Sequence, residues 1–367
     1  MLFILDSSVG NIDLTCLEQN RALENLLGSY QNQNHLVFMP LKELRDFSTR
    51  MSEHLSYGSR VVLNTLYNKA PEYKGLVDII DYKCVVYASD REESVYREGN
   101  VWHVPLKYFS RSGLLQSVVM GEGDLDPHLY YQFADFYRKK NGIGSFFPKA
   151  RLQAGGGSGV PEALKDYLNS EFSPCICVTD SDKFHPKYKK SLTAGKCEIV
   201  IGERKNIVEY IQLEEREVEN IIPKDLLAKF SDVARLEGYC NNFMLENSEH
   251  WYYLDLKDGI SINWVAAQDP ETQKYWLKLK TQLEKDKKRC VRCEAATDSK
   301  DCACNKMPGL GSRILEHSVK YLRDNGSHVC MKLLINDLRW ERIGKAVFDF
   351  AIAPGGERVV VRAADRS

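Results

Sequence analysis

Acidic side chains follow three short apolar runs in the middle of the chain. The runs cover residues 114–120, 175–179 and 208–213, and each has the composition of a buried β-strand. The carboxylates that follow them are Glu122, Asp126, Asp180, Asp182, Glu217 and Glu219. Parallel strands of an open α/β sheet end at one crevice, where ligands bind. Carboxylates gathered there repel one another unless a divalent cation neutralises them. The sequence therefore predicts a site for Mg²⁺ or Mn²⁺.

The first acidic segment is typical of a strand, a turn and a helix. Apolar residues at helical spacing follow it, and Asp126-Pro127 has the composition of an N-cap and a first-turn proline. Glu122 is then expected at a strand end and Asp126 at a helix start. Taken alone, the segment is also explained as a solvated turn with a capping residue.

The two later acidic segments differ in their expected backbone. Asp180 and Asp182 come directly after five β-prone residues, so both carboxylates can point into one site from a strand end. If Glu217-Val218-Glu219 is extended, its two glutamates share one face. Glu219 is the stronger candidate of the two, and a solvated charge run is the alternative for both.

The order and spacing of these segments resemble a known domain. Glu-Gly-x-x-x-Asp from Glu122, Asp-x-Asp from Asp180 and Arg-Glu-x-Glu-Asn-Ile-Ile-Pro from Arg216 look like a Toprim domain. More narrowly, they resemble the overcoming-lysogenisation-defect (OLD) nucleases and the Toprim effectors of bacterial anti-phage systems. The resemblance covers roughly residues 112–225. It implies an α/β fold with a Toprim-like Rossmannoid parallel sheet flanked by helices.

The resemblance also implies an enzyme, a Mg²⁺-dependent endonuclease that cleaves DNA or tRNA. Glu122, Asp180 and Asp182 would hold one cation, and Asp126 with Glu217 or Glu219 would hold a second. Two cations about 4 Å apart activate a water and stabilise the leaving oxygen. OLD-type nucleases use a lysine beyond the acidic motifs, and Lys345 is the candidate here.

One departure from the family concerns ATP. OLD-type nucleases carry an ATPase in the same chain, whereas this sequence has no Walker A motif. We therefore expect a separate ATPase or sensor subunit acting in trans, and a toxic effector role in anti-phage defence. The alternative is a non-catalytic subunit that binds nucleic acid or a partner.

Four cysteines form a second candidate site. Cys290, Cys293, Cys302 and Cys304 make two close pairs, which suits one tetrahedral Zn²⁺. Four thiolates leave no open position, so such a zinc would be structural. Free thiols or a local cross-link are the alternatives.

The length of 367 residues predicts two or three domains. We expect an N-terminal α/β domain over residues 1–111, a Toprim-like catalytic domain over 112–240 and a mostly helical region over 241–367. Residues 1–111 contain no recognisable catalytic motif. They are expected to be a scaffold, a docking domain or the surface of a homo-oligomer.

Composition and charge set broader limits. The net charge is −1 and 43% of residues are hydrophobic, which is ordinary for a protein with packed cores. Any contact with nucleic acid must then come from local basic segments, such as residues 185–190. No apolar run approaches the length of a membrane span, so no membrane partner is expected. Eleven cysteines, several within apolar runs, suit a reduced compartment, and the cytoplasm is expected.

Three further segments carry structural expectations. Residues 197–201 are short and β-branched and predict a strand. Residues 264–289 predict one long helix. The glycine run 155–159 predicts either a tight turn or a backbone contact with phosphate.

Overall fold

The computed structural model describes residues 1–89, 94–111, 113–202, 206–234, 236, 249–288 and 305–355. Cys290, Cys293, Cys302 and Cys304 lie outside these residues. The zinc site therefore stays a prediction.

The chain divides into two compact units that interleave along the sequence. Unit 1 comprises Met1–Cys177, Ile199–Tyr210 and Glu341–Ser367, and unit 2 comprises Val178–Glu198 and Ile211–Trp340. This division differs from the three consecutive domains predicted, whose boundaries stay a prediction.

Unit 1 contains a five-stranded sheet with the order β2-β1-β3-β5-β4. Its strands are β1 (Leu2–Leu5), β2 (Leu36–Phe38), β3 (Lys83–Tyr87), β4 (Tyr96–Glu98) and β5 (Val101–Pro105). Only β4 runs antiparallel to its neighbour. The parallel strands are rich in buried apolar residues because helices cover such sheets. The α/β character expected for residues 1–111 is thus observed.

Three helices belong to this part of unit 1, namely α1 (Leu17–Gln31), α2 (Leu41–Met51) and α3 (Tyr57–Ile79). Both α1 and α3 pack on β2. The hydroxyl groups of Tyr30 and Tyr73 share a buried hydrogen bond of 2.6 Å between these two helices. Ser56 starts α3 by accepting a hydrogen bond from the Ser59 backbone N–H.

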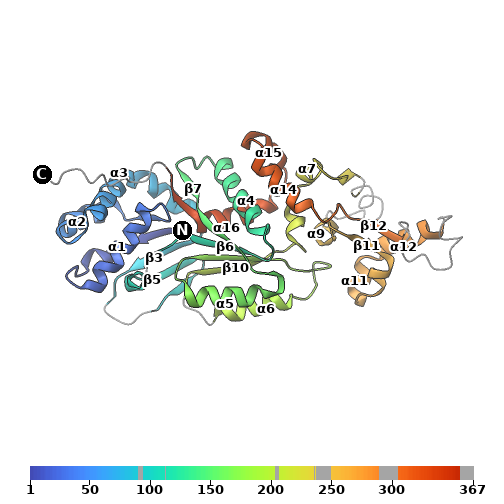
Figure 1. Ribbon diagram of the computed structural model, residues 1–367, viewed down its shortest axis with the longest axis horizontal. Helices are drawn as coiled ribbons and strands as arrows, with labels where there is room; N and C mark the ends of the chain where they lie inside the picture. The colour runs from blue at the N-terminus through green and yellow to red at the C-terminus, as the bar shows by residue number, and fades with distance from the viewer. Residues whose placement is uncertain are drawn as a thin grey trace. The chain divides into compact units, whose positions relative to one another are not determined.

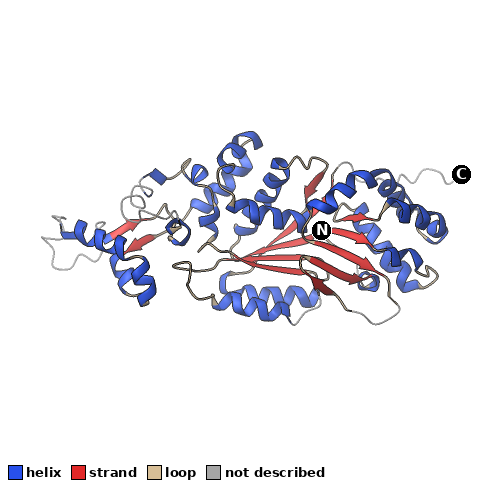
Figure 2. Cartoon of the chain, turned by 180° about the vertical axis from the view of Figure 1, so that it is seen from behind, coloured by secondary structure: helices blue, strands red, loops and turns tan. Residues whose placement is uncertain are grey.

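A second sheet has the order β10-β9-β6-β8 and appears as long red arrows in Figure 2. Its strands are β6 (Ser117–Gly121), β8 (Ala150–Ala154), β9 (Cys175–Thr179) and β10 (Val208–Gln212). The central strand β6 runs parallel to both β8 and β9. All residues of β6 and β9 are buried. The α/β class with parallel sheets flanked by helices is therefore observed.

Helices α4 (Asp126–Lys140) and α5 (Val160–Ser170) connect these strands. They lie on opposite faces of the sheet (Figure 1). The chain moves from β6 to β8 through α4 and returns past β6 to β9 through α5. Parallel crossovers are right-handed, so crossovers in opposite directions place their helices on opposite faces.

Two two-stranded sheets and further helices complete the described elements. In unit 1, β7 (Phe146–Pro148) pairs antiparallel with β13 (Ile352–Pro354), and in unit 2 β11 (Gly259–Ser261) pairs antiparallel with β12 (Lys306–Pro308). Among the described residues of unit 2, the helices are α7 (Lys224–Leu227), α9 (His250–Tyr253), α10 (Ile262–Ala266), α11 (Pro270–Tyr275), α12 (Leu277–Lys288), α14 (Ile314–Asp324) and α15 (Ser327–Leu334). Helices α6 (Leu192–Gly202) and α16 (Arg339–Ala351) begin in unit 2 and end in unit 1, whereas β9 and β10 do the reverse.

The strand predicted over residues 197–201 is wrong, because these residues belong to α6. Ser191 accepts a hydrogen bond from the Ala194 backbone N–H at the start of that helix. Ala194 and Cys197, three residues apart, are its buried positions, while Ile199 is exposed. Helical contacts therefore override the local β propensity of the segment.

The single helix predicted over residues 264–289 is also wrong, since the described part forms α10, α11 and α12. Asp269 caps α11 by accepting hydrogen bonds from the backbone N–H groups of Glu271 and Thr272. Pro270 follows in the first turn of α11.

Membrane spans were expected to be absent from the sequence. Among the described residues, none of the helices combines the length and apolar character that a membrane crossing requires.

Candidate functional site

Unit 2 joins the second and third acidic segments through backbone hydrogen bonds. The backbone N–H groups of Ser181 and Asp182 both donate to the Arg216 carbonyl, each at 3.0 Å. The Ser181 hydroxyl donates to the Glu215 carbonyl at 2.6 Å. In the reverse direction, the Val218 backbone N–H donates to Asp180 Oδ1 at 2.9 Å. The turn that carries Asp180 and Asp182 is thus fixed beside the segment that carries the glutamates.

The glutamate segment is a short 3₁₀ helix, not the extended segment predicted. This helix covers Val218–Ile221 and follows Glu217, whose backbone N–H donates to Asn220 Oδ1 at 3.0 Å. The Asn220 amide also donates to the carbonyls of Trp251 and Leu254. Asn220 is fully buried, and its side chain holds the turn in place.

Glu217 and Glu219 are both buried and share a cation. The Lys257 ammonium lies 3.1 Å from Glu217 Oε2 and 3.4 Å from Glu219 Oε1. Burial lowers the pKa of Lys257, but the carboxylates of Glu219, Glu217 and Asp180 outweigh it, so the pKa is raised. Lys257 is therefore charged and neutralises part of this acidic group.

Arg216 is a second cation within the same group. Its Nε lies 3.1 Å from Glu217 Oε1, and its Nη2 lies 3.2 Å from Asp255 Oδ2. The guanidinium also lies 4.8 Å from the centre of the Phe184 ring. Arg216 thus holds Glu217 in position against Asp255 and Phe184.

Sequence reasoning missed Lys257. No spacing rule marks it, because it stands in the turn Asp255–Asp258 before β11. The signal that could have indicated it is indirect. Two buried carboxylates require a counter-charge, and a lysine near a tight turn can supply one.

Asp182 has a left-handed backbone conformation. Its φ is +54°, in the left-handed region that aspartate tolerates better than most side chains. This backbone conformation allows the consecutive N–H groups of Ser181 and Asp182 to donate to the same Arg216 carbonyl. Loss of solvent around the Asp182 carboxyl and the nearby charge of Glu217 raise the pKa of Asp182, while Arg216 and Lys257 act in the opposite direction.

The first acidic pair belongs to unit 1. Glu122 follows β6 directly, and Asp126 is the first residue of α4. Asp126 Oδ2 accepts a hydrogen bond of 2.7 Å from the Gly123 backbone N–H. A Cβ atom at Gly121 would lie 2.7 Å from the Cβ of Asp126, so glycine is required there. The tight turn therefore depends on Gly121 as well as on the acidic residues.

The glycine run after β8 closes on the same turn. The Gly155 N–H donates to the Gly121 carbonyl at 2.7 Å, and the Gly157 N–H donates to the Glu122 carbonyl at 2.9 Å. A Cβ atom at Gly155 would lie 2.5 Å from a methyl carbon of Val160. These contacts make the run a close-packed turn, and a contact with phosphate stays a prediction.

The structure therefore brings together Asp180, Asp182, Glu217 and Glu219 within unit 2. Glu122 and Asp126 belong to the turn between β6 and α4 in unit 1. The sharing of cations between the two sets stays a prediction.

Lys345, the predicted catalytic lysine, lies in unit 1 on α16. Its ammonium is 2.8 Å from Asp81 Oδ2 and 3.0 Å from Asp349 Oδ2, and it donates to the Ile79 carbonyl at 3.1 Å. These contacts join α16 to the end of α3. A role of Lys345 near a phosphate stays a prediction.

The loop after Asp182 combines buried rings with exposed lysines. His185 is buried, and its ring packs edge-on against Tyr188 at 5.4 Å between centroids. The Phe184 ring packs edge-on against Trp264, and the Phe184 carbonyl accepts a hydrogen bond from the Trp276 indole. Lys187 and Lys189 are exposed on this fixed loop.

The described residues contain no group of three or more His, Cys, Asp or Glu side chains placed to hold a metal ion. The carboxylates of unit 2 nevertheless have the right donor chemistry, because hard divalent cations prefer oxygen ligands. Two of those carboxylates, Glu217 and Glu219, contact the ammonium group of Lys257.

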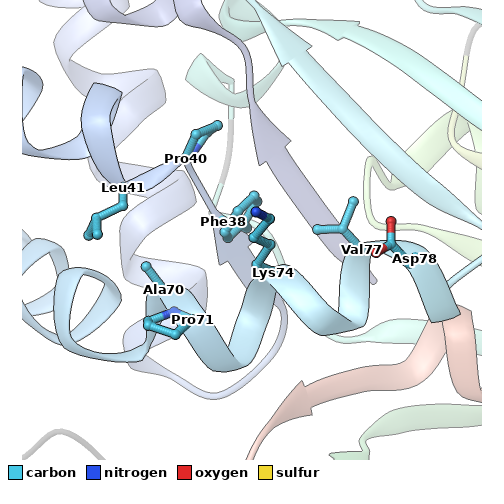
Figure 3. Close-up of a pocket in the computed structure, with 8 residues that line it drawn as sticks. All are labelled: Phe38, Pro40, Leu41, Ala70, Pro71, Lys74, Val77 and Asp78. Carbon is cyan, nitrogen blue, oxygen red and sulfur yellow. The ribbon is translucent and has the colours of Figure 1, made fainter.

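A pocket of about 490 Å³ lies elsewhere in unit 1 (Figure 3). Phe38 at the end of β2 and Leu41 at the start of α2 line one side, and Ala70, Lys74 and Asp78 of α3 line the other. None of the predicted catalytic residues is among its lining residues.

Comparisons with models of protein families, with curated proteins and with solved structures found no match to this chain.

Proposed function

We propose that this chain is a Mg²⁺- or Mn²⁺-dependent nuclease of the Toprim type that hydrolyses phosphodiester bonds in DNA or tRNA. One observation carries the proposal. Three segments of unit 2 contribute four carboxylates and a lysine to one group, and two of the carboxylates are buried. Nothing in the packing of a small unit requires so many carboxylates in one place.

The oxygen donors of this group are of the chemical type that a hard divalent cation prefers, and binding would require them to move from their present positions. Asp180, Asp182 and one of the two glutamates would hold it. When bound, such a cation lowers the pKa of a coordinated water and stabilises the charge on a leaving oxygen.

The surrounding residues position this set. The Val218 N–H fixes one oxygen of Asp180, and Arg216 fixes one oxygen of Glu217. The exposed Lys187 and Lys189 on the adjoining loop attract a phosphate backbone. Catalytic carboxylates that are held in this way lose little freedom when a substrate binds.

The resemblance to OLD-type nucleases and Toprim effectors supplies the wider proposal. In that setting the chain is the toxic effector of an anti-phage system, and a separate ATPase or sensor subunit activates it in trans.

The decisive test is cleavage of plasmid DNA and of total tRNA by the full chain. Each polymer is incubated with Mg²⁺, with Mn²⁺ or with a chelator. We expect metal-dependent cleavage that Asp180→Asn lowers by at least about a hundredfold. This variant keeps an oxygen that can accept the Val218 N–H, so it removes charge and not the fold.

Asp166→Asn is the matched control, because Asp166 is exposed on α5 and belongs to none of the acidic segments. It should cleave like the wild type. Metal-independent cleavage, or full activity in Asp180→Asn, would contradict the proposal.

The second candidate is a non-catalytic subunit that binds nucleic acid or a partner. The observation that favours it is the pairing of Glu217 and Glu219 with Lys257, which makes the acidic group an internal salt-bridge network. In that case Asp180→Asn should leave binding to the polymer or partner unchanged, and no metal should promote cleavage.

A further inference from the structure

The ammonium of Lys257 lies between two buried carboxylates. It contacts Glu217 at 3.1 Å and Glu219 at 3.4 Å, and both glutamates are buried. Divalent cations such as Mg²⁺ and Mn²⁺ contact carboxylate oxygens more closely, at about 2.0–2.2 Å. A cation at that distance and the ammonium would repel each other strongly in this poorly solvated space. The two cannot bind the glutamates together.

The backbone of Lys257 is fixed, so only its side chain can move. The Lys257 carbonyl accepts a hydrogen bond from the Gly311 N–H at 3.1 Å, and the Leu256 carbonyl accepts one from the Leu310 N–H at 2.7 Å. A side chain at Gly309 would collide with the Lys257 carbonyl, which shows how closely the two segments pack.

The side chain of Lys257 is exposed enough to move away from the two glutamates. It is 35% exposed, whereas the side chains of Glu217 and Glu219 are 11% and 3% exposed. Rotation about its four-carbon stem would move the ammonium into solvent without any change in the backbone. The carboxylates would then be left with an uncompensated charge that a divalent cation can neutralise.

We propose that Lys257 is the resident counter-ion of this carboxylate group, and that a divalent cation binds Glu217 and Glu219 only by displacing it. The inference rests on the proposed function, since it concerns how the same carboxylates take up their metal. It describes an internal inhibitor: the chain keeps its acidic group neutral and folded until metal, with or without a bound substrate or partner, replaces the lysine.

The test is Mn²⁺ binding to the full chain without nucleic acid, measured by calorimetry and by the electron paramagnetic resonance signal of free Mn²⁺. Three proteins are compared, namely wild type, Lys257→Met and Lys278→Met. Lys278 is an exposed lysine on α12 of the same unit, so its variant controls for the loss of one positive charge. We expect Lys257→Met to bind Mn²⁺ about 10- to 100-fold more tightly than the other two proteins.

Each other result has a definite meaning. Equal or weaker binding by Lys257→Met, with clear binding by wild type, overturns the counter-ion role and leaves the proposed metal-dependent function intact. Absence of Mn²⁺ binding from all three folded proteins overturns both proposals.

A second variant covers the case in which Lys257→Met does not fold, as judged by circular dichroism. Lys257→Arg keeps the charge and can bind both carboxylates more firmly. It should bind Mn²⁺ more weakly than wild type, and an unchanged affinity would overturn the counter-ion role.

Discussion

Two lysines of this protein each contact two carboxylates, yet their surroundings differ. Lys345 of unit 1 contacts Asp349 and Asp81, and Asp349 stands four residues further along the same helix. The Asp349 carboxylate also accepts the backbone N–H groups of Asp81 and Tyr82. Lys257 of unit 2 contacts Glu217 and Glu219 from a different segment, beside two further carboxylates.

The difference indicates which lysine can be exchanged. Asp349 is fully buried and is bound by backbone donors as well as by Lys345, so this pair fastens α16 to the connection between α3 and β3. The carboxylates around Lys257 exceed its single charge, and a stronger cation can compete for them. We therefore interpret Lys345 as a structural contact and Lys257 as a replaceable one.

The largest expected effect on stability comes from Lys345→Met. It leaves the Asp349 carboxylate buried without its cation, which should lower the free energy of unfolding by about 3–5 kcal/mol at pH 8. Urea unfolding measures this loss, and Lys345→Met with Asp349→Asn should recover part of it. A loss below about 1 kcal/mol would contradict the structural interpretation.

The same variant tests the predicted catalytic role of Lys345. If the folded variant cleaves nucleic acid like wild type at low temperature, Lys345 acts only on stability. Loss of cleavage by a fully folded variant would instead support a position near the scissile phosphate.

The second-largest expected effect is a fall in the free energy of unfolding with rising pH, caused by Asp349 of the Lys345–Asp349 pair. Burial raises the pKa of Asp349 from 3.8 to about 6, against the opposing effect of Lys345 and two backbone donors. Between pH 3.8 and about 6, the Asp349 carboxyl is therefore protonated in the native state and ionised in the unfolded chain. The resulting stability is complete below pH 4 and is lost as the pH rises through 6, by about 3 kcal/mol.

Unfolding of wild type and of Asp349→Asn between pH 4 and pH 7 measures this contribution. The free energy of unfolding of wild type should fall relative to the variant as the pH rises. Parallel curves for the two proteins would show that Asp349 does not titrate in this window.

The smallest effect is expected for Lys257→Met without metal. Its side chain is 35% exposed, and Arg216 still contacts Glu217 after the lysine is removed. We expect a loss of about 1 kcal/mol in the free energy of unfolding. Mn²⁺ should restore this loss in Lys257→Met and should have no such effect on Lys345→Met. Restoration in both variants would remove the distinction between the two lysines.

The sequence predicts the parallel strands well because their evidence is local. Residues 117–121 and 175–179 are continuous apolar runs, as strands covered by helices on both faces must be. The acidic residues at the ends of these runs could be identified for the same reason. Residues 197–201 have a similar composition, but their partners in space made them helical.

The glutamate segment shows a different limit. An alternating pattern predicted that Glu217 and Glu219 share the face of a strand, whereas Asn220 holds them in a 3₁₀ turn. Its amide binds carbonyls of Trp251 and Leu254, about thirty residues later in the chain. No local pattern reports such a contact.

The sequence by itself determined the α/β class, the strands and the positions of the carboxylates that follow them, because runs of apolar residues and turn residues act over a few positions. Only the tertiary structure decided what neutralises those carboxylates. Lys257 reaches Glu217 and Glu219 from a turn held by β11 and by the segment that follows β12. A buried charge must find a counter-charge wherever the fold brings one within about 4 Å. That choice depends on the path of the whole chain.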